Sequence, residues 1–132
     1  MTIKHLTVII AAIMMIMLIN GCGRAAVSQN TISIQEKQWN EKGSDPKDIL
    51  SYSPIKKGDI LYNANDTKIS VKSINDNKVI LAIEGYMVEP NENGTINLNA
   101  DPLEKIEIKR GESKEIDSQT MDAGFKLYIT YK

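Results

Sequence analysis

The chain has 132 residues, of which 25% are charged and 42% hydrophobic, and its formal net charge is −1. This length gives room for one small domain after a leader. The near-zero charge gives no basic footprint for nucleic acid, so a nucleic-acid partner is not expected. The sequence holds one cysteine and one histidine, which excludes an internal disulfide and a cysteine-rich metal site.

The first 22 residues have the pattern of a leader. Lys4 gives a positively charged start, and residues 6–19 form an apolar run that only Thr7 interrupts. This run is shorter than the roughly 20 apolar residues of a membrane span, and it fits the apolar region of a signal peptide, about 7 to 15 residues long. The run ends in Ile19-Asn20-Gly21-Cys22. That order, an aliphatic residue, a tolerant position, a small residue and a cysteine, resembles the lipobox of bacterial membrane lipoproteins.

The resemblance implies that Cys22 is the lipid attachment residue. Diacylglycerol would be transferred to its thiol and the chain cut before it, so that residues 1–21 are the signal peptide. The mature protein would then be anchored at the extracytoplasmic face of the cell membrane, and its two acyl chains meet the requirement for stable attachment. Two alternatives stay open: an uncleaved N-terminal anchor helix with an incidental cysteine, and a secretory leader cut elsewhere.

The cleaved chain would contain few groups that support catalysis. Removing Lys4 and His5 leaves 15 basic and 17 acidic residues, no histidine and no free thiol. A serine–lysine pair is the remaining nucleophilic arrangement, but Ser113 and Lys114 are adjacent, and neighbours on a strand point to opposite faces. The carboxylates that could serve glycoside hydrolysis are scattered along the chain (Glu84, Glu89, Asp101 and Asp122). We therefore expect no enzyme activity.

Residues 22–57 are interpreted as the lipidated cysteine followed by a polar tether. No sustained period of apolar residues runs through them. Asp45-Pro46-Lys47-Asp48 favours the start of a short helix, with Asp45 as the N-cap, that ends before Pro54. A flexible tether of this length would span about 30 to 35 Å. Trp39 lies within it, either packed against the domain or available as an interfacial or partner contact.

From about Gly58 the pattern changes to an alternation of apolar and polar residues, which indicates strands with one buried face. The alternation is strong at residues 69–72, 79–84, 96–99, 106–109 and 125–132, and weaker at 60–62, 86–88 and 114–117. Turn-forming residues separate these runs at 75–77, 93–94 and 110–113. We therefore predict an all-β domain over residues 58–132, a small antiparallel β-sandwich (Ig-like) of about seven to eight strands.

The inward positions of these strands predict the hydrophobic core. Its members are aliphatic apart from one phenylalanine: Leu61, Ile69, Val71, Val79, Leu81, Ile83, Ile96, Leu98, Ile106, Ile108, Ile116, Phe125, Leu127 and Ile129.

Calcium is the metal that the sequence comes nearest to accommodating. Residues 89–94 place oxygen-bearing side chains at alternate positions before Gly94, as in the first half of an EF-hand loop, but position 12 is Ala100 where a bidentate glutamate is needed. Loops at one end of the sandwich could instead gather Asp66, Asp76, Asp101 and Asp122. Because Asn, Asp and Gly are also ordinary turn formers, we assign no metal and no cofactor.

Two further groups have a structural and a functional interpretation. The five tyrosines, Tyr52, Tyr62, Tyr86, Tyr128 and Tyr131, could line an aromatic face for a sugar or peptide, or pack across strands. Residues 120–124 form either a plain turn or a functional loop.

These observations favour a non-enzymatic binding or adaptor module of the cell envelope. The partner, besides the membrane itself, could be an envelope protein, a transport complex or a cell-wall polymer, and addition of a strand to an exposed sheet edge is the expected route of docking. The alternative is a small-ligand or calcium-binding lipoprotein.

Overall fold

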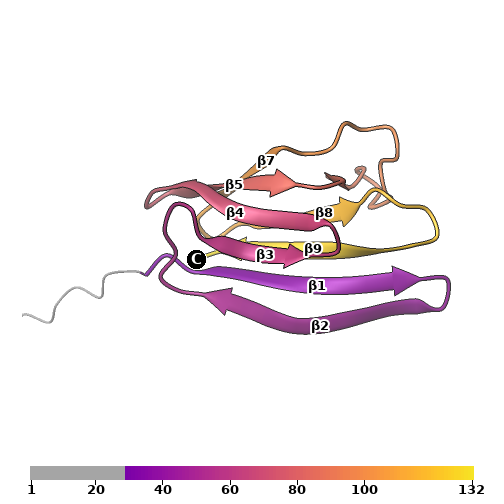
Figure 1. Ribbon diagram of the computed structural model, residues 1–132, viewed down its shortest axis with the longest axis horizontal. Helices are drawn as coiled ribbons and strands as arrows, with labels where there is room; N and C mark the ends of the chain where they lie inside the picture. The colour runs from indigo at the N-terminus through magenta and orange to yellow at the C-terminus, as the bar shows by residue number, and fades with distance from the viewer. Residues whose placement is uncertain (1–28) are drawn as a thin grey trace, which may run out of the picture.

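The computed structural model describes residues 29–132, and this part of the chain is built from strands (Figure 1). In chain order they are β1 (Ile32–Asn40), β2 (Gly43–Tyr52), β3 (Ile60–Ala64), β4 (Thr67–Ile74), β5 (Lys78–Glu84), β6 (Met87–Val88), β7 (Lys105–Lys109), β8 (Ser113–Ser118) and β9 (Ala123–Tyr131). No helix among residues 29–132 is long and apolar enough to span a membrane. The leader and Cys22 lie outside the described residues.

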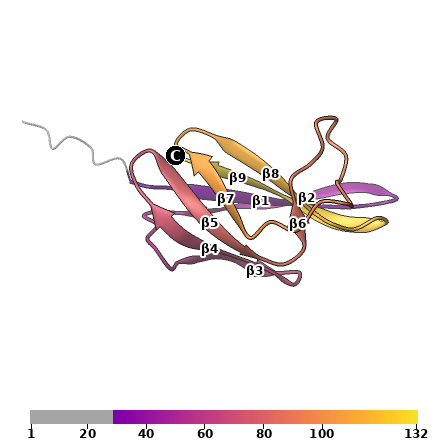
Figure 2. The same cartoon turned by 90° about the horizontal axis from the view of Figure 1, so that it is seen from above.

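The strands form two antiparallel sheets that pack face to face, which confirms the predicted all-β sandwich. The five-stranded sheet has the order β2-β1-β9-β8-β6, and the four-stranded sheet has the order β3-β4-β5-β7. Figure 2 shows the two layers from above. The sandwich has nine strands, seven of which lie within residues 58–132, where seven to eight were expected.

The core lies between the sheets and follows the alternation of the strands. In β9, for example, Phe125, Leu127 and Ile129 are buried while the residues between them are partly exposed. Twelve of the fourteen predicted core residues are buried. The exceptions are Ile96, which is half-buried, and Leu98, which is exposed.

The prediction of a tether over residues 22–57 is wrong for residues 32–52, which form β1 and β2. β1 pairs with β9 along its whole length and with β2 on its other side. The expected helix start at Asp45 is also wrong, because Asp45 and Pro46 lie within β2. Since β2 is the edge of its sheet, the missing N–H of Pro46 is tolerated there. Trp39 is accordingly a strand residue of β1.

The prediction of a strand over residues 96–99 is also wrong, because this segment belongs to the loop between β6 and β7. The Asn93–Gly94 turn is formed, with Gly94 at φ 78° and the Asn91 N–H bonded to the Thr95 carbonyl at 2.8 Å, but no strands flank it. The loop folds back on the sheets instead, and the Gln119 side-chain amide donates to the carbonyls of Asn97, Leu98 and Ala100. These bonds tie the loop to the residue that follows β8.

The first and last described residues lie at the same end of the molecule. Thr31 and Lys132 exchange two backbone hydrogen bonds of 3.0 and 2.9 Å. The Tyr131 hydroxyl oxygen lies 2.9 Å from Asn30 Oδ1 and 2.8 Å from the Asn75 carbonyl oxygen, either of which can accept its one proton. The Arg110 guanidinium lies 4.8 Å from the centre of the Tyr131 ring. These contacts therefore join residues near both termini of the described chain to the turns that contain Asn75 and Arg110.

Candidate functional site

The two sheets do not end at the same place on the flank formed by β2 and β3. The Tyr62 ring of β3 stacks on Phe125 of β9, with ring centroids 6.2 Å apart, and the Tyr62 hydroxyl donates to Glu36 of β1 at 2.9 Å. The edge of the four-stranded sheet therefore lies over β1 and β9, and β2 extends beyond it (Figure 1). Every residue of β2 is exposed except Tyr52, which is partly buried.

This offset leaves a groove between the two edge strands. It consists of two adjoining hollows of about 270 and 370 Å³ that share Glu36, Leu50 and Tyr62. Leu50 and Ile60 are 48% and 55% exposed, so the groove presents aliphatic surface from both of its edge strands. We call this feature the β2–β3 groove; its lining is Ile34, Glu36, Lys47, Asp48, Leu50, Tyr52, Ile60, Leu61, Tyr62, Asn63 and Ala64.

Glu36 is the charged group that β1 places in this groove. It lies where the register between β1 and β2 shifts, and such a bulge re-aims side chains. Its carboxylate accepts hydrogen bonds from Gln38 Nε2 at 2.9 Å, Asn65 Nδ2 at 3.3 Å and the Tyr62 hydroxyl at 2.9 Å. All three donors are neutral, and no cation among residues 29–132 forms an ion pair with Glu36.

The neighbouring groups hold this carboxylate in place without neutralising it. Burial raises the pKa of the Tyr62 hydroxyl well above its usual value, and the hydrogen bond to Glu36 adds to the shift, so Tyr62 remains a donor. Its oxygen also accepts from Asn65 Nδ2 at 2.8 Å. Lys47 lines the same hollow, but its ammonium binds Asp45 at 3.1 Å. The groove therefore presents a fixed negative charge beside an apolar surface.

The two edges of the groove differ in how they are protected. Edge strands expose unpaired backbone N–H and C=O groups, and proteins commonly guard them with proline, charge or bulges. β2 carries Pro46, Lys47, Asp48 and a bulge. β3 has the sequence ILYNA, with no charged residue and no proline, and its own register shift lies between Ile60 and Tyr62. The less guarded backbone edge on this flank is therefore that of β3.

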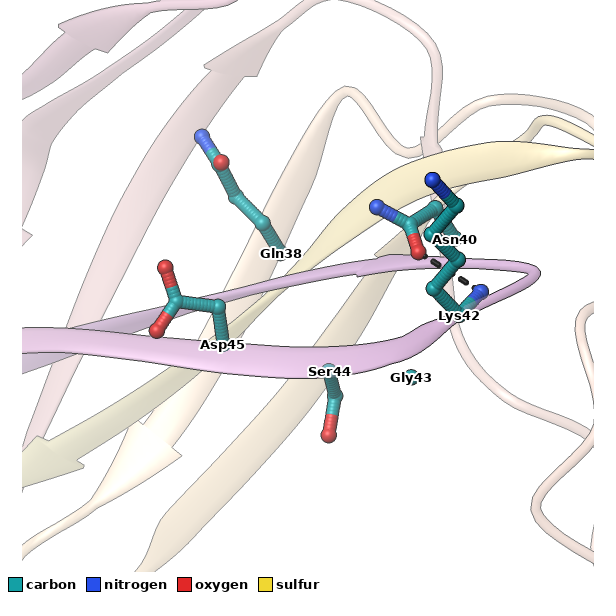
Figure 3. Close-up of a pocket in the computed structure, with 6 residues that line it drawn as sticks. All are labelled: Gln38, Asn40, Lys42, Gly43, Ser44 and Asp45. Carbon is teal, nitrogen blue, oxygen red and sulfur yellow. Dashed lines mark hydrogen bonds between the residues drawn. The ribbon is translucent and has the colours of Figure 1, made fainter.

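A hollow separate from the β2–β3 groove lies at the tip of the β1–β2 hairpin (Figure 3). It is lined by polar groups of the turn, and Asn40 Oδ1 accepts from the Lys42 N–H at 2.8 Å. Figure 3 shows Ser44 pointing away from the side on which Gln38 and Asp45 lie. Because the side chains diverge and no apolar wall is present, this hollow is better explained as the geometry of a turn.

The residues considered for calcium are not brought together. Within residues 29–132 no group of three or more His, Cys, Asp or Glu side chains is placed to hold a metal ion. Asp66 and Asp76 lie in the turns before β4 and β5, Asp101 in the loop before β7, and Asp122 in the turn before β9. The oxygen-rich segment 89–94 uses its side chains within its own turn, since Asn93 Oδ1 accepts from the Thr95 N–H and hydroxyl.

The remaining predicted chemistry is also dispersed. The Ser113 hydroxyl pairs with Thr130 at 2.7 Å, and the Lys114 ammonium lies 3.4 Å from Glu112, so the two do not form a catalytic pair. Among the tyrosines, Tyr62 and Tyr131 are buried in the core, while Tyr86 is 73% exposed. No common aromatic face forms, although Tyr52 and Tyr62 both line the β2–β3 groove.

Sequence reasoning missed an ionisable cluster on the outer face of the five-stranded sheet. The Lys126 ammonium lies 2.8 Å from Glu115 and 3.6 Å from Asp117. Asp117 is fully buried, and neither of its oxygens has a hydrogen-bond partner among the described residues. A hollow of about 240 Å³ includes Glu115 in its lining but neither Asp117 nor Lys126, so the buried carboxyl does not face it.

Comparison with known proteins gives no relative for this chain. No protein-family model matches it, and neither the curated proteins nor the solved structures contain a significant match.

Proposed function

We propose that this protein is a membrane-anchored, extracytoplasmic lipoprotein whose β-sandwich is a non-enzymatic binding or adaptor module of the cell envelope. The observation that carries the proposal is the β2–β3 groove, which combines exposed aliphatic side chains with a strand edge that has no charged residue and no proline. An apolar surface beside an unpaired strand edge is suited to docking a partner there.

The lipobox resemblance at Cys22 supports the anchored part of the proposal. Nine residues separate Cys22 from Ile32, the start of β1. Even fully extended they would reach about 30 Å, so the sandwich would remain near the membrane surface. This is a shorter tether than the 35 residues expected from the sequence, and it would favour partners close to the membrane.

The side-chain chemistry supports binding over catalysis. The described residues contain no histidine and no cysteine, and the serine hydroxyl weighed as a nucleophile has no base beside it. The groove offers an apolar surface, one oriented carboxylate and a backbone edge. These are the components of a peptide-recognition site.

The test is site-specific photocrosslinking of the full-length protein in the cells that produce it. A photoreactive amino acid replaces Leu50 in the groove or, as a matched control, Leu98 in the loop between β6 and β7; both leucines are about half exposed. A Cys22→Ala version of the Leu50 variant removes the attachment residue. Adducts are identified by mass spectrometry.

We expect one envelope component to be crosslinked from position 50 and not from position 98. Its yield should collapse when Cys22 is replaced, because the unanchored protein no longer meets the partner. Equal adducts from both positions, or none from either, would count against a binding module at this groove.

A further inference from the structure

We infer that the β2–β3 groove binds an extended segment of a partner protein as an added strand on β3, with a lysine or arginine of that segment bound to Glu36. This inference rests on the proposed function and specifies the chemistry of the partner. Its physical basis is the exposure of β2, which no strand of the four-stranded sheet covers. One more strand beside β3 would cover it.

The geometry selects β3 as the strand that is extended. A strand hydrogen-bonded to β3 would lie over β1 and β2, because Tyr62 of β3 already contacts β1 and β9. Its inward side chains would cover Leu50, which is now 48% exposed. Addition to β2 would leave Leu50 uncovered by the opposite layer, and β2 is guarded by Pro46 and its neighbouring charges.

The charge of the groove selects a basic side chain. Three neutral donors orient the Glu36 carboxylate, and a carboxylate has about four acceptor positions. An ammonium or guanidinium would add a charge-assisted hydrogen bond, roughly twice as strong as a neutral one. Lys47, the cation in the lining of the groove, forms an ion pair with Asp45. Asp48 adds a second negative charge to the lining.

The spacing of the groove predicts a short sequence pattern. Leu50 is paired with Ile34, and Glu36 lies two residues further along β1. Alternate residues of a strand are about 6.5 to 7 Å apart, so a strand running over β1 would place successive inward side chains at Leu50 and at Glu36. The expected partner segment therefore carries an aliphatic residue two positions from a lysine or arginine.

The inference is tested with synthetic peptides and the full-length protein in detergent micelles, followed by NMR of its backbone amides. The probe is the capped heptapeptide Thr-Ile-Thr-Lys-Thr-Ile-Thr, which presents the pattern in both chain directions. One comparison peptide has norleucine in place of lysine. Another is N-methylated at alternate residues along one edge, so that it cannot pair as a strand. The protein variants are Glu36→Gln and, as a matched control at an exposed position of the β1–β2 turn, Glu41→Gln.

We expect the lysine peptide to shift the amide signals of residues 60–64 and to bind about tenfold more tightly than the norleucine peptide, the difference expected of one charge-assisted hydrogen bond. Glu36→Gln should abolish that preference, and Glu41→Gln should keep it. The N-methylated peptide should bind weakly to every form of the protein.

The inference is overturned if the lysine and norleucine peptides bind equally, if Glu36→Gln leaves the preference intact, or if N-methylation has no effect. It is also overturned if the protein alone forms a dimer through residues 60–64. Any of these results, obtained together with specific photocrosslinking from position 50, would leave the proposed binding module standing and remove only its assignment to a basic strand.

Discussion

Asp117 is the one buried carboxyl group among residues 29–132. Its side chain is fully buried on the face of β8 opposite to Ile116. Burial raises the pKa of its carboxyl to about 6; Lys126 opposes this shift and Glu115 adds to it. The carboxylate is therefore charged at neutral pH at a cost to the folded state.

That cost predicts how stability depends on pH. An aspartate of the unfolded chain titrates near pH 3.9, so the folded state binds this proton more tightly than the unfolded state does. The proton on Asp117 therefore stabilises the folded state fully below about pH 4, and this stabilisation is lost as the pH rises through about 6. We expect Asp117→Asn to raise the free energy of unfolding by about 3 kcal/mol at pH 8 and to leave it unchanged at pH 3.5.

Urea unfolding of both proteins at the two pH values measures this difference. Asp101→Asn, at an exposed position, serves as the control and should have no effect at either pH. A lower stability of Asp117→Asn at pH 8 would mean that the contact with Lys126 outweighs the burial of the charge.

At the scale of single elements, β5 and β9 contribute the centre of the core. Leu81 and Leu127 are both fully buried, and truncating a leucine in a packed core removes its transfer free energy and leaves a cavity. We expect Leu81→Ala and Leu127→Ala each to lower the free energy of unfolding by about 2 to 5 kcal/mol. Leu98→Ala, at the exposed loop position, should change it by less than about 0.5 kcal/mol. The free energies of unfolding are measured by thermal or urea denaturation. A loss for Leu98→Ala as large as that of the core variants would contradict this description of the core.

The elements that were predictable from the sequence are those with one continuous buried face. β4, β5, β7 and β9 lie under the opposite sheet, so their inward positions are aliphatic almost throughout. The run at 96–99 has the same alternation but lies in a loop. Alternation over four residues makes a strand possible, but a strand also needs a neighbouring strand to pair with. Its Leu98 remains exposed.

β1 and β2 could not be predicted because only half of β1 lies under the other sheet. Ile32 and Ile34 are buried, but the next inward position is Glu36, so the alternation ends after two residues. This end of the alternation at Glu36 is the one feature of the sequence that marks the candidate site. The groove itself depends on where the four-stranded sheet ends above β1, and that offset is a property of the two sheets together.

At the scale of the whole molecule, the sandwich begins about 25 residues earlier than the change of pattern at Gly58 suggests. β1 lies between β2 and β9 and pairs with both. A chain that starts at residue 58 would lose two of the five strands of that sheet and expose the inner faces of Leu127 and Ile129, now fully buried.

We therefore expect a chain starting at residue 29 to fold and one starting at residue 58 to remain unfolded. Circular dichroism and the dispersion of amide NMR signals distinguish the two outcomes. A cooperative unfolding transition in the shorter chain would show that β3 to β9 suffice, and would remove β1 and β2 from the folding unit.

The interior position of β1 also determines how the domain would bear a mechanical load. In the proposed anchored protein, a pull on a bound partner reaches the membrane through the N-terminal end of β1. This force acts along the strand, and β1 is hydrogen-bonded on both sides, to β2 and to β9. The two ladders would therefore be sheared as a whole instead of being unzipped one bond at a time. An attachment point on an edge strand would share the load with one ladder only.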